Sequence, residues 1–231
     1  MTMNYARPEM LVDGDWLQAH LSDPNLRIVD CDLPDAHRRA HIPGAVVPKD
    51  NRFKDPDNPK FVMQPAQFAA AMAELGIGDE TQVIAYDASG SLNAGRFWWC
   101  LAYYGNSNVR VLNGGWNLWL KQGRPMTMAE AKFSAGPFTP RADESMRASA
   151  EHIMSILERP DVVVLDVRSD GEWEGTNSRG NKRAGRMPGA VHIEWTNNMT
   201  PDDERCFKSP ADLKAMLEAV GVTPDKEIVT V

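Results

Sequence analysis

The chain has 231 residues, of which 42% are hydrophobic and 25% are charged, and its net charge is −7. This composition is typical of a soluble globular protein, and the acidic balance argues against nucleic acid or an anionic membrane as a partner. No apolar run reaches the roughly 18 residues of a membrane-spanning helix, and the N-terminus lacks the basic and apolar stretches of a signal peptide. The three cysteines are far apart and form neither a disulfide framework nor a metal site, which favours a reducing cytoplasm.

The first half of the chain alternates short apolar stretches with amphipathic ones. Buried strands are predicted at residues 27–30, 82–86 and 109–112. Helices are predicted at residues 67–75, through 96–101 and at 116–120. Strands that alternate with helices predict a parallel sheet in an α/β fold.

A compositional change divides the chain into two parts. Residues 125–141 are rich in Pro, Ala, Thr and Gly, and we predict that they link a domain at 1–124 to a domain at 142–231. After this segment the pattern restarts, with a helix at 151–157 and a strand at 162–166.

The second part repeats the first in register. Pro43 and Pro188 each begin a Pro-Gly-Ala-Val turn, and each lies 43 positions before the end of an apolar strand, at Tyr86 and Val231. Within this offset of 145 positions the prolines, glycines and apolar side chains coincide, while nine extra residues lie upstream, around 177–182. An ungapped match over more than forty positions predicts two homologous domains.

The strand that ends at Tyr86 runs into a loop of small residues led by Asp87, which opens a helix. Such a loop directs backbone N–H groups and a helix N-terminus at whatever leads it. The corresponding loop of the second copy would begin at the position after Val231. We therefore expect the second domain to be incomplete at its C-terminal end, with the chain breaking off one residue before its chemistry.

Together these motifs resemble the rhodanese family, the two-domain sulfurtransferases. In the first half the resemblance rests on residues 41–45 (HIPGA), 83–87 (VIAYD), 96–99 (RFWW) and 111–116 (VLNGGW). In the second half it rests on residues 165–168 (LDVR), 187–191 (MPGAV) and 223–229 (TPDKEIV). It implies two tandem rhodanese-like domains, each a mostly parallel sheet flanked by helices, the first being non-catalytic with Asp87 where the nucleophile would be. The nucleophilic cysteine is then expected directly after Val231, so no catalytic residue lies within 1–231.

The implied reaction is transfer of a sulfane sulfur through a cysteine persulfide. A thiolate attacks the outer sulfur of thiosulfate and releases sulfite, and cyanide or a thiol then takes the sulfur. A free cysteine is mostly protonated at neutral pH, so convergent N–H groups and a helix N-terminus are needed to lower its pKa. The resemblance implies small-molecule partners and no metal or organic cofactor. Because the two domains would supply each other's interface within one chain, we expect a monomer, in the cytoplasm that the cysteines favour.

The side chains that we select lie near the expected site. Arg168, Arg183, Arg186 and Trp195 are substrate-binding candidates, and Asp166 and Asp87 are candidates for structural support. Each of these residues also has a purely structural interpretation. Asp166 and Arg168 can form a salt bridge, the other arginines can be solvated surface charges, and Trp195 can be a core residue. None of the three cysteines leads a glycine-rich loop, so we expect them to be structural or incidental.

One position departs from part of the family. Many relatives that use mercaptopyruvate, and some thiosulfate enzymes, have an arginine four residues after the strand-end arginine, where this chain has Glu172. A carboxylate would repel a carboxylated donor, which favours thiosulfate or an uncharged persulfide carrier over 3-mercaptopyruvate. Two other readings stay open: a non-catalytic rhodanese-like binding module or inactive fragment, and a phosphatase or arsenate reductase of similar fold. The tandem arrangement argues against the last of these.

Overall fold

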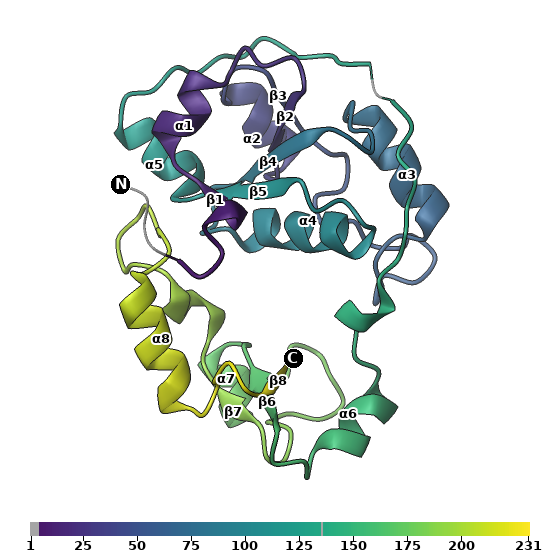
Figure 1. Cartoon of the computed structure of the whole chain (residues 1–231), viewed down its shortest axis with the longest axis vertical. Coiled ribbons are helices and arrows are strands. Elements are labelled where there is room, and N and C mark those ends of the chain that lie inside the picture. The colour runs from purple at the N-terminus through teal and green to yellow at the C-terminus, as the bar shows by residue number, and fades with distance from the viewer. Residues whose placement is uncertain (1–4, 135) are drawn as a thin grey trace. The chain divides into compact units, whose positions relative to one another are not determined.

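The computed structural model describes residues 5–134 and 136–231 and divides into two compact units. The N-terminal unit comprises Arg7–Glu144 and Asp202–Cys206, and the C-terminal unit comprises Ser145–Pro201 and Phe207–Val231 with residues 5–6. Each unit is built on a parallel sheet with flanking helices, as the alternation of elements predicted (Figure 1). Residues 1–4 of the predicted first domain and residue 135 of the predicted linker lie outside the described residues. No described helix combines the length and apolar character needed to cross a membrane.

The sheet of the N-terminal unit has the strand order β1-β5-β4-β2-β3. Its strands are β1 (Leu11–Val12), β2 (Leu26–Asp30), β3 (Ala45–Val46), β4 (Gln82–Tyr86) and β5 (Val109–Leu112). Strand β4 is paired on both sides, with β2 from Leu26↔Gln82 to Asp30↔Tyr86 and with β5 from Val83↔Val109. Strands β2 and β4 are covered on both faces, which explains why they read as nearly continuous apolar runs.

Helices cover both faces of this sheet. They are α1 (Gly14–Ala19), α2 (Pro34–Arg39), α3 (Pro65–Glu74), α4 (Leu92–Tyr103) and α5 (Gly115–Lys121), with a short 3₁₀ turn η1 (Pro8–Met10). Figure 1 shows α1 and α5 on one face and α4 on the other. Leu17 and Trp119 pack with Ile28 and Ile84 in the core beneath α1 and α5, and all four are at least 97% buried. Alternation along β4 directs Val83 and Ala85 to the opposite face.

Residues 125–141, which we predicted to link the domains, lie along the N-terminal unit. The backbones of Thr127 and His41 exchange two hydrogen bonds of 2.9 Å. Further along, the amide of Asp79 donates to the carbonyl of Pro137, and the amide of Arg141 donates to the carbonyl of Tyr104. The described parts of the segment, 125–134 and 136–141, are therefore hydrogen-bonded along the N-terminal unit and have little regular secondary structure.

The sheet of the C-terminal unit has the order β7-β6-β8. Its strands are β6 (Val162–Asp166), β7 (Val191–His192) and β8 (Glu227–Thr230). Its helices are α6 (Ala150–Ile156), α7 (Asp170–Glu174) and α8 (Pro210–Ala219), and 3₁₀ turns lie at η2 (Glu144–Met146) and η3 (Trp195–Asn198). By position in the repeat, β7, β6 and β8 correspond to β3, β2 and β4.

The repeat that the sequence predicted is present in the structure. Helices α3 and α8 both begin at a proline, and their bounds differ by 145 positions at each end. The isolated antiparallel bridge Lys54↔Val62 has a counterpart at the same offset, Met199↔Phe207. The general pattern of α/β folds does not explain why two isolated bridges and two helices are separated by the same interval. The two halves are therefore copies of one fold.

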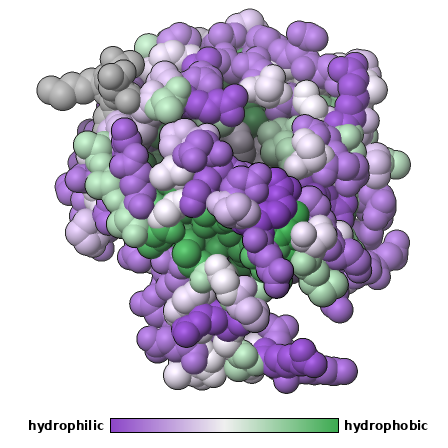
Figure 2. All heavy atoms as spheres, turned by 60° about the horizontal axis from the view of Figure 1, so that its bottom comes forward, coloured by the Kyte–Doolittle hydropathy of each residue, from purple (hydrophilic) through white to green (hydrophobic). Residues whose placement is uncertain are grey.

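The equivalent apolar positions differ in burial between the two units. Phe68 and Met72 of α3 are fully buried, whereas α8 has no buried residue. Val83 of β4 is fully buried, whereas its counterpart Ile228 in β8 is 36% exposed. Figure 2 shows hydrophobic residues at the surface on the face that it presents. Burial of apolar surface stabilises a fold by roughly 25 cal/mol for each Å² that is removed from water. Apolar surface that stays exposed does not contribute this free energy.

A close approach between α5 and the loop after β4 generates a stability prediction. Gly115 has φ +50°, and a Cβ there would overlap the carbonyl oxygen of Asp87. Gly115→Ala is therefore expected to cost about 2–4 kcal/mol. The matched control is Gly95→Ala inside α4, where a Cβ meets open space and should add about 0.5–1 kcal/mol of stability. Urea unfolding followed by tryptophan fluorescence measures both, and equal midpoints for the two variants would contradict this account.

Candidate active-site edge of the C-terminal unit

The carboxyl ends of β6 and β8 lie side by side. The amide of Val231 donates to the carbonyl of Leu165, and the amide of Val167 donates to the carbonyl of Val231, both at 3.0 Å. The backbone at Val231 is therefore held against the segment that carries Arg168. In parallel sheets with flanking helices, this edge is where ligands bind.

Asp166 and Arg168 form a bidentate ion pair at the end of β6. Arg168 Nε donates to Asp166 Oδ1 at 2.9 Å, and its Nη2 donates to Oδ2 at 2.6 Å. The same Nη2 donates to the carbonyl of Gly185 at 3.0 Å. This bond connects the end of β6 to the segment between α7 and β7. Asp166 is fully buried, while the side chain of Arg168 remains 34% exposed. The pair fixes the direction of the guanidinium and leaves part of it at the surface of the edge.

The ionisation of this pair follows from its geometry. Burial disfavours the charged form of Asp166, but hydrogen bonds from Arg168 and the charges of Arg168 and His192 outweigh it and lower the pKa of Asp166. The hydrogen bond to Asp166 in turn raises the pKa of Arg168. Both groups are therefore charged across the physiological range, and the edge keeps a fixed guanidinium.

A stack of three side chains supports the neighbouring turn. The guanidinium carbon of Arg186 lies 4.7 Å from the centroid of the Trp173 ring, and that ring stacks on His192 at 4.8 Å. His192 Nδ1 lies 2.9 Å from the carbonyl oxygen of Asp166, and Nε2 lies 2.9 Å from a carboxylate oxygen of Asp170. The stack thus joins the turn that carries Arg186 to β7, to α7 and to the end of β6.

The remaining predicted residues lie around the same edge or in the other unit. Trp195 is half-buried at the start of η3, and its amide donates to the carbonyl of Val167 at 3.0 Å. Arg183 is exposed in the segment between α7 and β7. The C-terminal unit therefore brings Asp166, Arg168 and Trp195 together around the end of β6, while Asp87 belongs to the N-terminal unit.

Glu172 has a local structural role. It is the third residue of α7, and its carboxylate accepts the hydroxyl of Ser169 at 2.8 Å in a capping box. Arg179 lies 3.5 Å from the same carboxylate, whose residue is only 6% exposed. Although burial opposes the charge, the hydrogen bonds from Ser169 and the nearby arginines lower the pKa of Glu172. The capping geometry directs this carboxylate at its own helix, which weakens the argument that it repels a carboxylated donor.

The N-terminal unit shows how the loop after the equivalent strand behaves. Asp87 is 2% exposed, and its carboxylate accepts four backbone N–H groups, from Ser89 and Ser91 on one oxygen and from Asn93 and Ala94 on the other. The four distances lie between 2.7 and 2.9 Å. The loop and the first turn of α4 therefore form an anion cradle that Asp87 fills with its own side chain.

The two strand-end edges carry opposite charge. Alignment of β2 with β6 pairs Asp30 with Asp166, and it pairs Asp32 with Arg168. In the N-terminal unit, burial and the charges of Asp30 and Asp87 raise the pKa of Asp32 to about 6. The same position of the fold thus repels anions in the first copy and attracts them in the second.

None of the three cysteines has the properties of a nucleophile. Burial, followed by neighbouring carboxylates, raises the pKa of the fully buried Cys31 well above its usual value. Burial also raises the pKa of Cys100 to about 12. At Cys206, burial and then Asp202 and Glu204 raise the pKa of the thiol. A raised pKa removes the thiolate that attack on sulfur requires.

Sequence reasoning did not identify Trp173 and His192. Neither residue belongs to a periodic pattern, since α7 spans five residues and β7 spans two. Their stacking depends on β7 lying beside β6, and this pairing is not visible in local sequence. The run of cations at 179–186 was the one available signal that this segment has a role at the edge.

Removal of the Asp87 carboxylate should destabilise the N-terminal unit. Asp87→Ala leaves four backbone N–H groups without their acceptor and is expected to cost about 2–4 kcal/mol, with Asp87→Asn in between because one oxygen remains. The control is Asp23→Ala, which removes an exposed carboxylate that accepts one N–H group, from Asn25. Urea unfolding measures the three variants, and an Asp87→Ala protein as stable as Asp23→Ala would contradict the cradle.

The raised pKa of Asp32 predicts a pH dependence of stability. Its ordinary value is 3.8 and its value in the fold is about 6, so the folded state binds this proton more tightly than the unfolded chain does. The stability from this group is present below about pH 4 and falls as the pH rises to about 6. We expect a fall of about 1–2 kcal/mol, less than the full shift implies, because solvent screens a half-buried carboxylate.

Unfolding in urea at pH 4, 5, 6 and 7 measures this fall. Asp32→Asn keeps an oxygen that can accept the amide of Ala88, which donates to Asp32 Oδ2 at 2.9 Å, but it does not titrate. The difference in unfolding free energy between the parent and Asp32→Asn should therefore change between pH 4 and 6. A difference that is constant with pH would show that Asp32 titrates normally.

Comparison with known proteins identifies the family. A family model described as Rhodanese-like domain matches residues 13–122 and 149–231. The chain is 37% identical over 241 residues to the sulfur carrier protein TtuD of Thermus thermophilus, and this match covers 98% of the chain and 83% of that protein. It is 34% identical over 229 residues to a thiosulfate sulfurtransferase of Azotobacter vinelandii, with the same two coverages.

A solved structure agrees with this assignment. The 3-mercaptopyruvate sulfotransferase SseA of Escherichia coli superposes with a TM-score of 0.82 at 26% identity, covering 96% of this chain and 87% of that one. Both copies of the repeat are matched by the same family description, and the relatives are matched across nearly the whole chain. The chain belongs to the two-domain rhodanese family of sulfurtransferases.

Proposed function

We propose that this protein transfers a sulfane sulfur from thiosulfate to cyanide or a thiol through a cysteine persulfide. The nucleophile is a cysteine at the position after Val231, which corresponds to Asp87 in the first copy. The observation that carries the proposal is the pairing of Val231 with Leu165 and Val167 beside the exposed part of Arg168. A residue that follows Val231 would leave the sheet at this basic edge.

The reaction proceeds in two displacements. The thiolate attacks the outer sulfur of thiosulfate, a sulfur–sulfur bond forms to the cysteine, and the bond to the inner sulfur breaks as sulfite leaves with its electron pair. Cyanide or a thiolate then attacks the outer sulfur of the persulfide and regenerates the cysteine thiolate. Each half-reaction is balanced without an external oxidant or reductant.

The residues of the edge have distinct roles in this proposal. Arg168 and Arg186 attract the anionic donor, and Arg183 adds to the positive potential that steers it. Asp166 holds Arg168 in place, and half-buried Trp195 limits access of water to the end of β6. The loop after the nucleophile supplies N–H groups that stabilise the thiolate, as the equivalent loop does for the Asp87 carboxylate.

Thiosulfate is the donor that we favour over 3-mercaptopyruvate. Position 172 lacks the arginine of many mercaptopyruvate relatives, and its carboxylate is engaged in the cap of α7. The missing cation at position 172, more than repulsion by the Glu172 carboxylate, therefore disfavours a carboxylated donor. A role as a carrier of persulfide sulfur uses the same cysteine and the same edge and differs in the acceptor. We further propose a monomer in the cytoplasm.

The test uses the protein extended beyond Val231 to the length of its relatives. Replacement of the cysteine after Val231 by serine should abolish turnover of thiosulfate with cyanide, and the 231-residue chain alone should be inactive. Equal activity of the serine variant, or turnover of thiosulfate by the 231-residue chain, would overturn the proposal. The ratio of kcat/KM for thiosulfate to that for 3-mercaptopyruvate decides the donor.

Substitution of Arg186 tests the basic edge. Arg186→Gln should raise the KM for thiosulfate about 5- to 10-fold with kcat nearly unchanged, because it removes charge that attracts the donor equally in the ground and transition states. The effect should shrink as salt is added. Lys214→Gln is the control, since Lys214 is an exposed cation on α8. The same KM shift in both variants would show a general charge effect and remove Arg186 from the site.

A further inference from the structure

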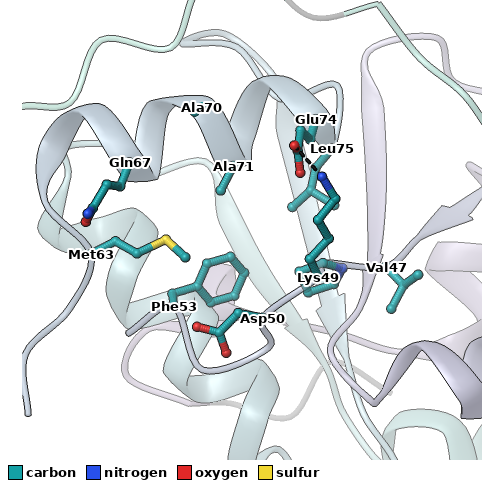
Figure 3. Close-up of a pocket in the computed structure, with 11 residues that line it drawn as sticks. Val47, Lys49, Asp50, Phe53, Met63, Gln67, Ala70, Ala71, Glu74 and Leu75 are labelled. Carbon is teal, nitrogen blue, oxygen red and sulfur yellow. Dashed lines mark hydrogen bonds and ion pairs between the residues drawn. The ribbon is translucent and has the colours of Figure 1, made fainter. Parts of the chain in front are cut away.

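A cavity of about 500 Å³ opens in the N-terminal unit between α3 and the segment that follows β3 (Figure 3). Its lining comes from residues 47–50, from Phe53 and Met63, and from one face of α3 with Leu75 at its end. None of these residues takes part in the strand-end edges or in the proposed sulfur transfer. The volume lies within the range of pockets that bind small molecules.

The apolar floor of the cavity is an aromatic side chain held in an unusual conformation. Phe53 is fully buried, stacks on Phe97 at 4.7 Å and meets Phe68 edge-on at 5.9 Å. Its φ of 50° is uncommon for a bulky residue, and a hydrogen bond of 2.8 Å from the amide of Met63 holds its carbonyl. Figure 3 shows the Phe53 ring beside Met63 and facing Ala71 of α3. Strained residues that the surroundings fix in this way cluster at ligand sites.

One helical stripe forms the wall. Gln67, Ala70, Ala71 and Glu74 lie at the spacing that places side chains on one face of α3, and all four line the cavity. The two alanines in the middle leave room opposite Phe53. In the second copy Ala71 and Glu74 correspond to Met216 and Ala219, so the cavity depends on residues of the first copy.

The charged groups of the cavity sum to one negative charge. Lys49 Nζ lies 2.6 Å from Glu74 Oε1, and these side chains are 83% and 54% exposed. The carboxylate of Asp50 accepts the amides of Arg52 and Lys54. An exposed ion pair contributes little to stability, so a ligand can compete for Glu74.

We propose that this cavity binds a small organic amine with an apolar body, such as an aromatic or branched primary amine. The apolar body lies against Met63 and Ala71, next to the buried ring of Phe53, and the ammonium pairs with the carboxylate of Glu74. An ammonium matches both the net charge of the site and its two acceptor groups, whereas a carboxylate would meet Asp50 and would have to displace Glu74 from Lys49. The inference is independent of the proposed sulfur transfer.

The experiment compares three probes that share a phenylalkyl body: 2-phenylethylamine, 3-phenylpropanoate and 2-phenylethanol. The readout is the ¹³C-methyl NMR signal of Met63, assigned with the variant Met63→Leu, because a phenyl ring beside this methionine shifts its methyl resonance. We expect a saturable shift with 2-phenylethylamine and a Kd on the order of 1 mM, as suits a probe of this size. The other two probes should bind at least about 5-fold more weakly.

Two variants separate the site from effects on folding. Ala71→Leu fills the cavity and should abolish the shift, whereas Ala73→Leu, at an exposed position of α3 outside the lining, should leave it unchanged. Glu74→Gln should weaken the amine and strengthen 3-phenylpropanoate, because Lys49 loses its partner. A reversed preference of this kind cannot result from partial unfolding.

Three results would overturn the inference. The first is no shift of Met63 up to about 10 mM 2-phenylethylamine, which is far weaker than a formed site of this size should bind. The second is equal binding of the three probes, which would mean non-specific apolar contact. The third is binding that survives Ala71→Leu, which would place the probe elsewhere.

Discussion

The pairing of Val231 with Leu165 and Val167 is the constraint on which the site of the C-terminal unit depends. Parallel strands end at a common edge, so this pairing sets the chemical surroundings of whatever follows β8. The bidentate pair of Asp166 and Arg168 and the stack of Trp173 on His192 are both anchored to the end of β6. A slip of one residue between β6 and β8 would turn the edge away from these groups.

The two copies of the fold have the same backbone arrangement but carry charges of opposite sign at the carboxyl ends of their strands. In the N-terminal unit, Asp87 fills the cradle of N–H groups, and Asp30 and Asp32 surround it with negative charge. In the C-terminal unit, an arginine replaces the acid at the end of β6, and the extra segment between α7 and β7 adds further cations. Because N–H groups and a helix N-terminus favour an anion, the side chain that leads the loop decides whether the cradle stabilises the fold or a reactive group.

Much of this arrangement could be predicted from the sequence. The offset of 145 positions fixed the equivalence of α3 with α8, and the Asp87 loop could be located because small residues followed an apolar strand. Other features depend on distant contacts. Proline and glycine content predicts a linker at 125–141, and the backbone hydrogen bonds between Thr127 and His41 could not be read from that composition. Glu172 was considered for its charge, but the capping box that engages it depends on Ser169 beginning a helix. No pattern in the sequence predicted the positive φ of Phe53.

The most direct test of this account is the intact mass of the protein extended beyond Val231, before and after exposure to thiosulfate. The account predicts a gain of one sulfur atom that cyanide removes, and no gain when the cysteine after Val231 is replaced by serine. The cyanide step matters because persulfide sulfur is transferable whereas oxygen added to a thiol is not. An unchanged mass, or a gain that persists in the serine variant, would contradict a persulfide at the basic edge of the C-terminal unit.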